Sequence, residues 1–365
     1  MQNDPTSAAP VGGTLRWHSP KEPGEQSLAM HHTIDASGQA HVTGDGWEFA
    51  LTAPKRLLPV TISKPWGEER WYTGMEARGE SRVQGERGDL PLSAYLALAP
   101  DQIGAGLPVV LLKLLVSRAE TRLGELYCEV HREKAEAYLV TGVDEQAWPA
   151  GEAWLRYGID PRERAASASD DALRARLYAS ATALEAAPND PERLAAFEQL
   201  IGRVPLRRGS CFQIARGVPH GLPHGVRVIE FQTPTYERLI LAASQPVVTQ
   251  DHWDVAAATA ALRLEAPDPT PPPDPSLPPG QLRLARFSDF GARVLHFNSQ
   301  TQGHRLPPTR GAVVVCCTAG QVSVGDLLLG PEEAVIVPQA AILEGMELTT
   351  EHEDGGGAVV AAADY

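Results

Sequence analysis

Short runs in which apolar and polar residues alternate dominate this sequence. Residues 41–43 and 47–52 are early examples, and residues 225–241 alternate most clearly. Alternation with a period of two predicts half-buried β-strands, and the 33 glycines and 31 prolines suit the many turns that join such strands. The pattern therefore predicts a mainly β protein.

The longest apolar run, residues 107–116, reads LPVVLLKLLV and predicts a buried strand. Residues 90–99 ahead of it are amphipathic and predict one or two helical turns. Lys113 interrupts the apolar run, and a lysine there must be paired or must point into a cavity. A functional role for Lys113 and simple snorkelling of its ammonium group to the surface stay open as alternatives.

Two helical patterns interrupt the strands at about residues 169–202. Ser169 or Asp170 would cap the first helix, whereas Asp190–Pro191 would begin the second and Gly202 would end it. The apolar faces comprise Leu173, Leu177 and Leu184 in the first helix and Leu194, Phe197 and Ile201 in the second. We interpret this segment as a helical insertion between β segments, because neither helix has a basic face for reading DNA.

The chain divides into four parts by composition. Residues 1–13 resemble a disordered lead. Residues 14–265 would form a metal-binding β domain that contains the insertion. Residues 266–280 are rich in proline and predict a stiff, extended linker. Residues 281–365 alternate strands and turns and predict a second, smaller barrel with a structural role, because they lack a comparable cluster of histidine and glutamate.

Charge and composition restrict the partners. The net charge of −14 argues against binding to nucleic acid or to anionic membranes, although local Lys and Arg residues still allow an anionic small-molecule substrate. The first ten residues lack a secretory signal, and residues 107–116 are too short to span a bilayer. The four cysteines show no CxxC pairing, and Cys128 and Cys211 fit buried free thiols. We expect a cytoplasmic protein, either a monomer or a homodimer.

Residues 124–142, GELYCEVHREKAEAYLVTG, carry the strongest chemical signal. Glu129 and His131 are two apart in a strand, so their side chains share one face. A tight four-residue turn after His131 would return the chain in a paired strand and bring Glu136 opposite them. A later stretch, GSCFQIARGVPHGLPH, supplies His220. Carboxylates and imidazoles that converge in this way predict one divalent metal ion inside a β-barrel.

The spacing of these residues resembles the two motifs of the cupin superfamily. The first motif would comprise Gly124, Glu129, His131, Glu136 and Gly142, and the second Gly209, Gly217 and His220. Within the cupins, the chain resembles the type I mannose-6-phosphate isomerases in its KPWG, LLKLL, GVPHGL and VIEFQTPTYERL segments and in its helical insertion. Lys134-Ala-Glu136 matches the Lys-x-Glu of that family.

The resemblance implies a double cupin fold of jelly-roll barrels with a helical insertion in the first barrel. It also implies zinc at Glu129, His131, Glu136 and His220, and the interconversion of mannose 6-phosphate and fructose 6-phosphate. The sugar phosphate would be the small-molecule partner.

Three features depart from the family pattern. Glu129 replaces a neutral glutamine, and the usually long loop before Glu136 is reduced to four residues. The segment Tyr236–Arg238 displaces an expected arginine. By formal counting, two carboxylates lower the net charge of a zinc site to about zero, which makes manganese or iron more acceptable.

Further residues are candidates for catalysis and substrate binding. Lys134 shares a face with Glu136 and would transfer a proton or hold a substrate oxygen, unless it is a plain turn lysine. Lys113 and Arg238 are candidates for catalysis and for binding the phosphate. Trp66 would form a wall of the cleft or a core anchor. His224 is expected at the rim.

We therefore expect a metal-dependent aldose–ketose isomerase that moves a proton through an enediol. A cupin that binds a sugar or a metal without turnover is the alternative, favoured by the short loop and the displaced arginine. A metal-dependent cupin oxygenase is less attractive, because the site lacks three histidines.

Overall fold

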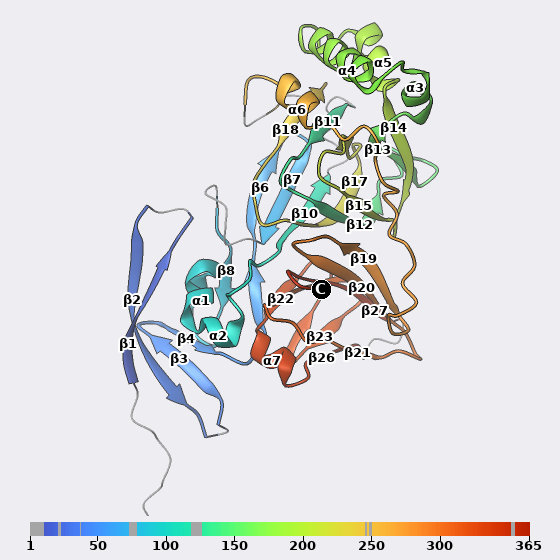
Figure 1. The fold of residues 1–365 in the computed structure, drawn as a ribbon. Helices are drawn as coiled ribbons and strands as arrows, with labels where there is room; N and C mark the ends of the chain where they lie inside the picture. Colours follow the sequence, from blue (N-terminus) through green and yellow to red (C-terminus); the bar gives the residue numbers. More distant parts are fainter. Residues whose placement is uncertain are drawn as a thin grey trace, which may run out of the picture. The chain divides into compact units, whose positions relative to one another are not determined.

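The computed structural model describes residues 11–20, 23–36, 38–72, 79–117, 126–244, 247, 250–351 and 355–365. Most of the lead expected at residues 1–13, and also Gly124, lie outside the described residues, whereas Val11 to Gly13 belong to a strand. The fold is mainly β, as the alternating pattern predicts, and the chain forms two compact units (Figure 1).

The first unit comprises Met1–Val60, Trp71–Leu112 and Pro273–Tyr365. Its largest sheet has the strand order β19 (Gln281–Arg286), β20 (Gly291–Phe297), β27 (Gly356–Ala362), β22 (Val313–Ala319), β25 (Ala334–Val337), β5 (Lys55–Leu58), β8 (Arg82–Gln84) and β9 (Asp89–Pro91). A smaller sheet has the order β21 (Gly303–Arg305), β26 (Glu347–Thr349), β23 (Val322–Val324) and β24 (Leu327–Leu329). Side chains from both sheets form an apolar core that includes Val315, Val324, Leu348 and Val360.

The first unit also contains a four-stranded antiparallel sheet near the start of the chain. Its strands follow in sequence order: β1 (Val11–His18), β2 (Glu25–Ile34), β3 (Ala40–Gly44) and β4 (Trp47–Ala50). Short helices complete this unit: α1 (Leu92–Leu98), α2 (Pro100–Ile103) and α7 (Gln339–Leu343). Helix α1 confirms the helical turns expected between residues 90 and 99.

The compact units differ from the contiguous domains expected from composition. Strand β5 pairs with β25, near the other end of the chain, so the early residues join the C-terminal barrel. Long-range pairing of this kind leaves no mark in composition. The division after Pro272 does fall within the proline-rich segment 266–280.

The second unit comprises Thr61–Arg70 and Lys113–Pro272 and contains two sheets. The larger has the order β15 (Cys211–Ile214), β12 (Glu136–Val143), β17 (Val226–Gln232), β10 (Leu111–Ser117), β7 (Gly67–Tyr72) and β6 (Val60–Lys64). The smaller has the order β14 (Ile201–Arg207), β13 (Glu152–Ile159), β16 (His220–Gly221), β11 (Tyr127–Val130) and β18 (Leu239–Ala243). Tyr138 and Phe212 of the larger sheet share a core with Leu155 and Leu206 of the smaller, so the two sheets pack face to face.

The connection between β11 and β12 is not the hairpin expected from the sequence. The two strands belong to different sheets, and residues 131–135 carry the chain from one sheet to the other. A link of five residues is short enough for a hairpin, but here it closes a barrel. Glu136 therefore faces Glu129 and His131 across the interior and does not lie beside them in one ladder.

The second unit has four helices in its described residues. They are α3 (Pro161–Ala166), α4 (Asp170–Glu185), α5 (Pro191–Glu198) and α6 (Val255–Ala261), and Figure 1 shows α3, α4 and α5 grouped together. Three of them, α4, α5 and α6, pack on the outer face of β11 and β18. Fully buried leucines of α4 pack with Phe197, Cys128 and Val130. Because Cys128 and Val130 point outward into this cluster, Glu129 between them points into the barrel.

The caps of the insertion helices agree with the sequence. The Ser169 hydroxyl accepts a hydrogen bond from the backbone N–H of Ala172, and Asp190 caps α5 with Pro191 in the first turn. Gly202 does not end the second helix, which stops at Glu198. Gly202 lies in β14, where a Cβ atom would come within 2.5 Å of the Tyr157 carbonyl oxygen, so close approach of two strands requires this glycine.

All four cysteines are free thiols. None of the helices in the described part of the chain has the length and apolar character needed to cross a lipid bilayer.

Candidate metal centre

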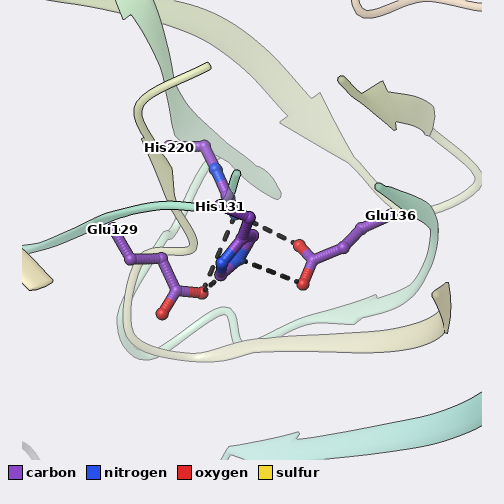
Figure 2. Close-up of side chains that lie close together, drawn as sticks. All are labelled: Glu129, His131, Glu136 and His220. Atoms are coloured by element: carbon purple, nitrogen blue, oxygen red, sulfur yellow. Dashed lines mark hydrogen bonds and ion pairs between the residues drawn. The ribbon is translucent and has the colours of Figure 1, made fainter. Parts of the chain in front are cut away.

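Four side chains converge inside the barrel of the second unit (Figure 2). The His131 Nε2 atom lies 3.4 Å from Glu129 Oε1 and 3.3 Å from Glu136 Oε1. The His220 Nε2 atom lies 3.1 Å from Glu136 Oε2 and 3.8 Å from Glu129 Oε1. Among the described residues this is the one group of histidine, cysteine and carboxylate side chains whose ligand atoms all lie within 4.8 Å of one another.

Backbone pairing fixes the positions of these donors. The two-residue strand β16 lies between β11 and β13, so His220 pairs with Glu129 on one side and with Tyr157 on the other. The His131 carbonyl oxygen accepts a hydrogen bond of 2.7 Å from the Gly217 N–H. Glu136 begins β12, where it pairs with Gln232. Sheet pairing therefore holds Glu129, Glu136 and His220, and a backbone hydrogen bond outside the strands holds His131.

The turn that joins β11 to β12 is held by Glu237. Its carboxylate accepts hydrogen bonds from the backbone N–H groups of Arg132 and Glu133, at 2.7 and 2.6 Å, and from Nε of Arg132 at 2.9 Å. Thr233 Oγ1 accepts a further bond from the Ala135 N–H. Glu237, which stands between Tyr236 and Arg238, therefore anchors the short connection between β11 and β12.

The donor set fits a divalent metal ion. In a tetrahedral zinc site with bonds of about 2.0–2.2 Å, neighbouring ligand atoms are about 3.3–3.5 Å apart, close to the distances observed here. His131 is 1% exposed, and within the described residues its Nε2 has no hydrogen-bond partner. A buried polar atom without a partner is costly unless it binds something else. Two imidazoles and two carboxylates suit zinc, manganese or iron.

A second layer of contacts sets the orientation of these donors. His220 Nδ1 lies 2.9 Å from the Val218 carbonyl oxygen, and as the donor it leaves the lone pair of Nε2 facing the cluster. The Tyr127 hydroxyl donates to Glu129 Oε2 at 2.7 Å, and the Tyr138 hydroxyl donates to Glu136. Burial raises the pKa of both tyrosines well above the usual value, so both hydroxyls remain donors.

Charge compensation keeps the two carboxyl groups ionised. Burial alone would raise the pKa of Glu136, but Lys134 and His131 hold it well below its usual range. Burial also opposes the ionisation of Glu129, and His131 again outweighs it and lowers that pKa. The two carboxyl ligands are therefore present in their metal-binding form at neutral pH.

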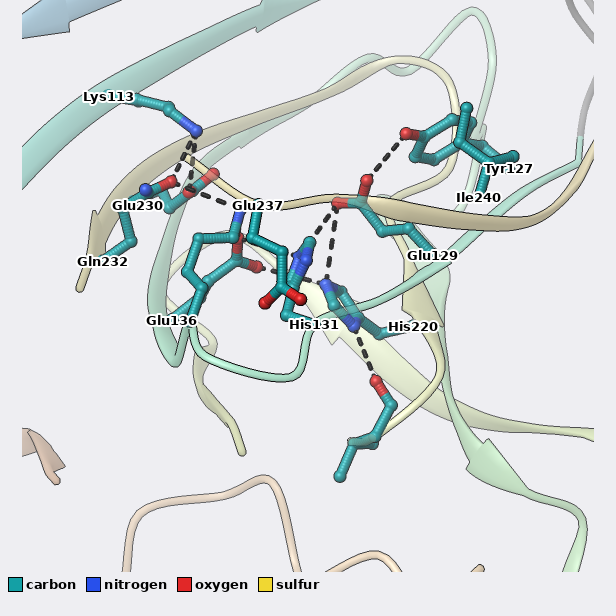
Figure 3. Close-up of polar contacts among 12 residues, drawn as sticks. Lys113, Tyr127, Glu129, His131, Glu136, His220, Glu230, Gln232, Glu237 and Ile240 are labelled. Carbon is teal, nitrogen blue, oxygen red and sulfur yellow. Dashed lines mark hydrogen bonds and ion pairs between the residues drawn. The ribbon is translucent and has the colours of Figure 1, made fainter. Parts of the chain in front are cut away.

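Two buried lysines lie beside these donors, and Figure 3 shows one of them, Lys113, next to Glu230 and Gln232. Lys134 Nζ lies 2.5 Å from Glu136 Oε1, and Lys113 Nζ donates to Gln232 Oε1 at 2.5 Å. The Gln232 amide nitrogen donates to two backbone carbonyl oxygens, which turns its Oε1 toward both lysines. Lys113 also lies 3.5 Å from Glu230, so the lysine is paired in the interior and does not snorkel to the surface.

Glu230 is a buried carboxyl group whose pKa is raised. It is 3% exposed, and burial together with the charge of Glu136 raises its pKa to about 7, although Lys113 partly offsets the effect. A carboxyl group that titrates near neutrality inside a site is a common property of catalytic machinery.

The other two candidates are Arg238 and Trp66. Arg238 precedes β18; burial lowers its pKa, but the neighbouring Tyr127 and Glu129 raise it above its usual value, so the guanidinium remains charged. Trp66 is half-buried in the turn between β6 and β7.

Sequence reasoning missed Tyr127, Tyr138, Glu230 and Gln232. Each lies two residues from another member of the site on the same strand. Tyr127 precedes Glu129, and Tyr138 follows Glu136. Polar side chains with this spacing on a buried strand were the available signal. The signal was faint for Glu230 and Gln232, because the strand around them is buried on both faces.

No protein-family model matches this sequence, and comparison with curated proteins also finds no match. Solved structures do match. A variant of phosphomannose isomerase from Salmonella typhimurium has a TM-score of 0.65 and 12% identity, covering 86% of this chain and 100% of that chain. Mannose 6-phosphate isomerase from Bacillus subtilis has a TM-score of 0.64 and 15% identity, covering 85% and 99%. A mannose 6-phosphate isomerase bound with zinc and yttrium has a TM-score of 0.63 and 12% identity, covering 86% and 100%.

At these identities the likeness shows the fold, which is the double cupin with a helical insertion expected from the sequence motifs.

Proposed function

We propose that this chain is a metal-dependent aldose–ketose isomerase that interconverts mannose 6-phosphate and fructose 6-phosphate. The observation that carries the proposal is the pair of buried lysines, Lys113 and Lys134, beside four metal-binding side chains in one interior. The fold shared with mannose 6-phosphate isomerases supports the same reaction.

The reaction moves one proton between adjacent carbons of the open-chain sugar, so it needs no oxidant or second substrate. A divalent ion held by Glu129, His131, Glu136 and His220 would polarise the carbonyl and hydroxyl oxygens of the sugar. The residues of the chain must then carry the proton and stabilise the charge of the enediolate.

We assign these tasks to the cations of the site. Burial lowers the pKa of Lys134, but Glu136 and Glu230 raise it above its usual value, so Lys134 is an ammonium group that holds a substrate oxygen and can donate a proton to it. Lys113 lies beside Glu230, whose pKa is about 7, and we assign these two residues to proton transfer together with Lys134. Arg238 is suited to the phosphate, and Trp66 is proposed as part of the substrate pocket.

A coupled assay tests the proposal directly. Fructose 6-phosphate production from mannose 6-phosphate is measured with zinc, manganese or iron added, and again after treatment with a chelator. We expect turnover with metal and its loss with chelator. Absence of turnover in a sample whose metal content has been verified would remove the isomerase assignment.

Substitution of the lysines adds a matched comparison. Lys113→Met and Lys134→Met should each lower kcat by about 10²-fold or more, the usual contribution of a proton-transfer group. Lys55, in the first unit, is equally buried and paired with Glu86, so Lys55→Met controls for the loss of a buried ion pair. Equal losses in all three variants would contradict the assigned roles.

Binding of the sugar without turnover is the alternative function. Glu129 favours it, because a second carboxylate weakens the ability of the metal to polarise a sugar oxygen. In that case calorimetry would detect mannose 6-phosphate binding to the metal-loaded protein while the coupled assay shows no product.

A further inference from the structure

A pocket of about 400 Å³ lies against the outer face of β13 in the second unit. In this strand Ala153, Leu155 and Tyr157 belong to the barrel core, so Trp154 and Arg156 between them point to the opposite face. Its lining includes Trp148, Trp154, Arg156, Arg203, Pro223 and His224. The pocket therefore opens away from the candidate metal centre and is independent of the proposed reaction.

Two indole rings provide flat apolar surfaces in this pocket. Trp154 is 41% exposed, which is unusual for a side chain of this size. The Trp148 Nε1–H donates to the His224 carbonyl oxygen at 2.7 Å, which fixes this ring against the loop after β16. A fixed ring and an exposed ring in one concave site suit the face of a sugar or of a nucleobase.

Two guanidinium groups give the same pocket a local positive charge. Arg156 is only 8% exposed, and its Nε and Nη2 donate to Glu198 Oε1 at 2.9 and 2.6 Å. Arg203, opposite Arg156 in the strand register, donates through Nη2 to the other oxygen of Glu198. One carboxylate thus serves two cations, and within the described residues the Nη1 groups of both arginines form no hydrogen bond.

We infer that this pocket binds a small ring compound that carries a phosphate, with the ring stacked on Trp154 and the phosphate held by Arg203 and Arg156. The local excess of positive charge contrasts with the net charge of −14 and selects an anion. Arginine is suited to phosphate oxygens, and the pocket volume lies within the range of small-molecule sites. A sugar phosphate and a nucleoside monophosphate share this chemistry.

Calorimetry on the full-length, metal-free protein tests the inference with two ring phosphates, glucose 6-phosphate and AMP. Glucose, adenosine and inorganic phosphate are the partial probes. We expect at least one ring phosphate to bind with a Kd of about 1 mM or below and each partial probe to bind at least about tenfold more weakly. Preference for AMP identifies a nucleotide site, whereas preference for glucose 6-phosphate identifies a sugar phosphate site.

Variants assign the binding to the pocket. Trp154→Ala and Arg203→Ala should each weaken binding by about tenfold or more, and Trp154→Phe should retain most of it. Both side chains are partly exposed, so neither substitution removes a core contact. Tyr178→Ala and Arg162→Ala, at exposed positions elsewhere in the same unit, should leave binding unchanged, as should His131→Ala in the candidate metal centre.

Three results would overturn the inference. No probe binds with a Kd below about 1 mM; or Trp154→Ala and Arg203→Ala bind as the wild type does; or His131→Ala abolishes binding, which would place the ligand in the barrel. The isomerase assay is unaffected by any of these results, so the two proposals fail separately.

Discussion

At the scale of single residues, Glu129 is the distinctive member of the candidate metal centre. Its Oε1 atom faces both imidazoles, and its Oε2 atom accepts a hydrogen bond from the Tyr127 hydroxyl. The tyrosine therefore decides which oxygen is available to a cation. A glutamine at this position would have a single side-chain oxygen and no charge, so it would not need a hydroxyl donor to select the oxygen that faces the cation.

Tyr127→Phe should weaken metal binding by about 10- to 100-fold, the usual effect of losing a partner of a metal ligand. The fold should remain, because the ring stays buried. Metal affinity is measured by competition with a chromophoric chelator. Tyr157→Phe is the control: it also loses one hydroxyl hydrogen bond, to the Pro267 carbonyl oxygen, and should bind metal as the wild type does. Equal affinities for the two variants would contradict the role of Tyr127.

Glu230 predicts a pH dependence of stability in the metal-free protein. Its pKa is about 7 in the folded state against an ordinary 4.5, so between these values the folded chain holds a proton that the unfolded chain has released. Raising the pH through this window therefore favours unfolding, by up to about 3 kcal/mol.

Glu230→Gln should remove this contribution. From about pH 5 to pH 8, the free energy of unfolding should fall by up to about 3 kcal/mol more in the wild type than in the variant. Urea titrations of chelated protein at both pH values measure the difference. Glu152→Gln, which alters a partly exposed pair with Arg207, should follow the wild type. Parallel pH profiles for wild type and Glu230→Gln would refute the raised pKa.

At the scale of elements, the link between β11 and β12 determines where the metal ligands meet. Residues 131–135 cross from one sheet to the other, and Glu237 binds two consecutive N–H groups of this link. Five residues suffice because Glu237 and Thr233 accept hydrogen bonds from the backbone N–H groups of the link. A longer loop would need no such anchor.

Glu237→Ala should lower the free energy of unfolding by about 2 kcal/mol, because it leaves N–H groups of Arg132 and Glu133 without their acceptor. It should also weaken metal binding about tenfold, since Lys134 and Glu136 follow directly in the chain. Urea denaturation and chelator competition measure the two effects. Glu152→Ala, which removes a partly exposed ion pair, should cost at most about 1 kcal/mol and leave metal affinity unchanged. Unaltered metal affinity in Glu237→Ala would show that the link needs no anchor.

The limits of sequence reasoning are clearest at this same scale. The period of two placed Glu129 and His131 on one face, and the capping residues Ser169 and Asp190 located the starts of two helices, because both are local properties of the chain. Strand partners are not local. The link after His131 has the length of a hairpin, and Gly202 has the residue type of a helix end, yet tertiary packing gives both another role. Only the alternating spacing could have suggested Glu230 and Gln232.

At the scale of the whole molecule, the metal centre is built on pairing that exists without the metal. His220 is hydrogen-bonded into a sheet on both sides, and Glu136 starts a strand with partners on both sides. The cluster is thus part of the β framework of the second unit, whereas the described C-terminal barrel has an apolar interior.

Removal of the metal should therefore leave the fold intact and lower its stability. Far-ultraviolet circular dichroism should be unchanged after chelation, while the free energy of unfolding should rise by about 4 kcal/mol when metal is restored at a thousandfold excess over its Kd. Thermal unfolding with and without added zinc checks both statements. Loss of β structure on chelation would show that the ion is needed for folding.

The two-residue strand that carries His220 has a consequence for how the protein would acquire its metal ion. Donors that are in position before the ion arrives allow it to enter and leave without refolding of the chain. Occupancy would then follow the free concentrations of competing ions in the surrounding solution, and a mixed nitrogen and oxygen donor set would accept whichever of several was most abundant. If one metal became scarce, another divalent ion would replace it in the site, and the site would stay occupied.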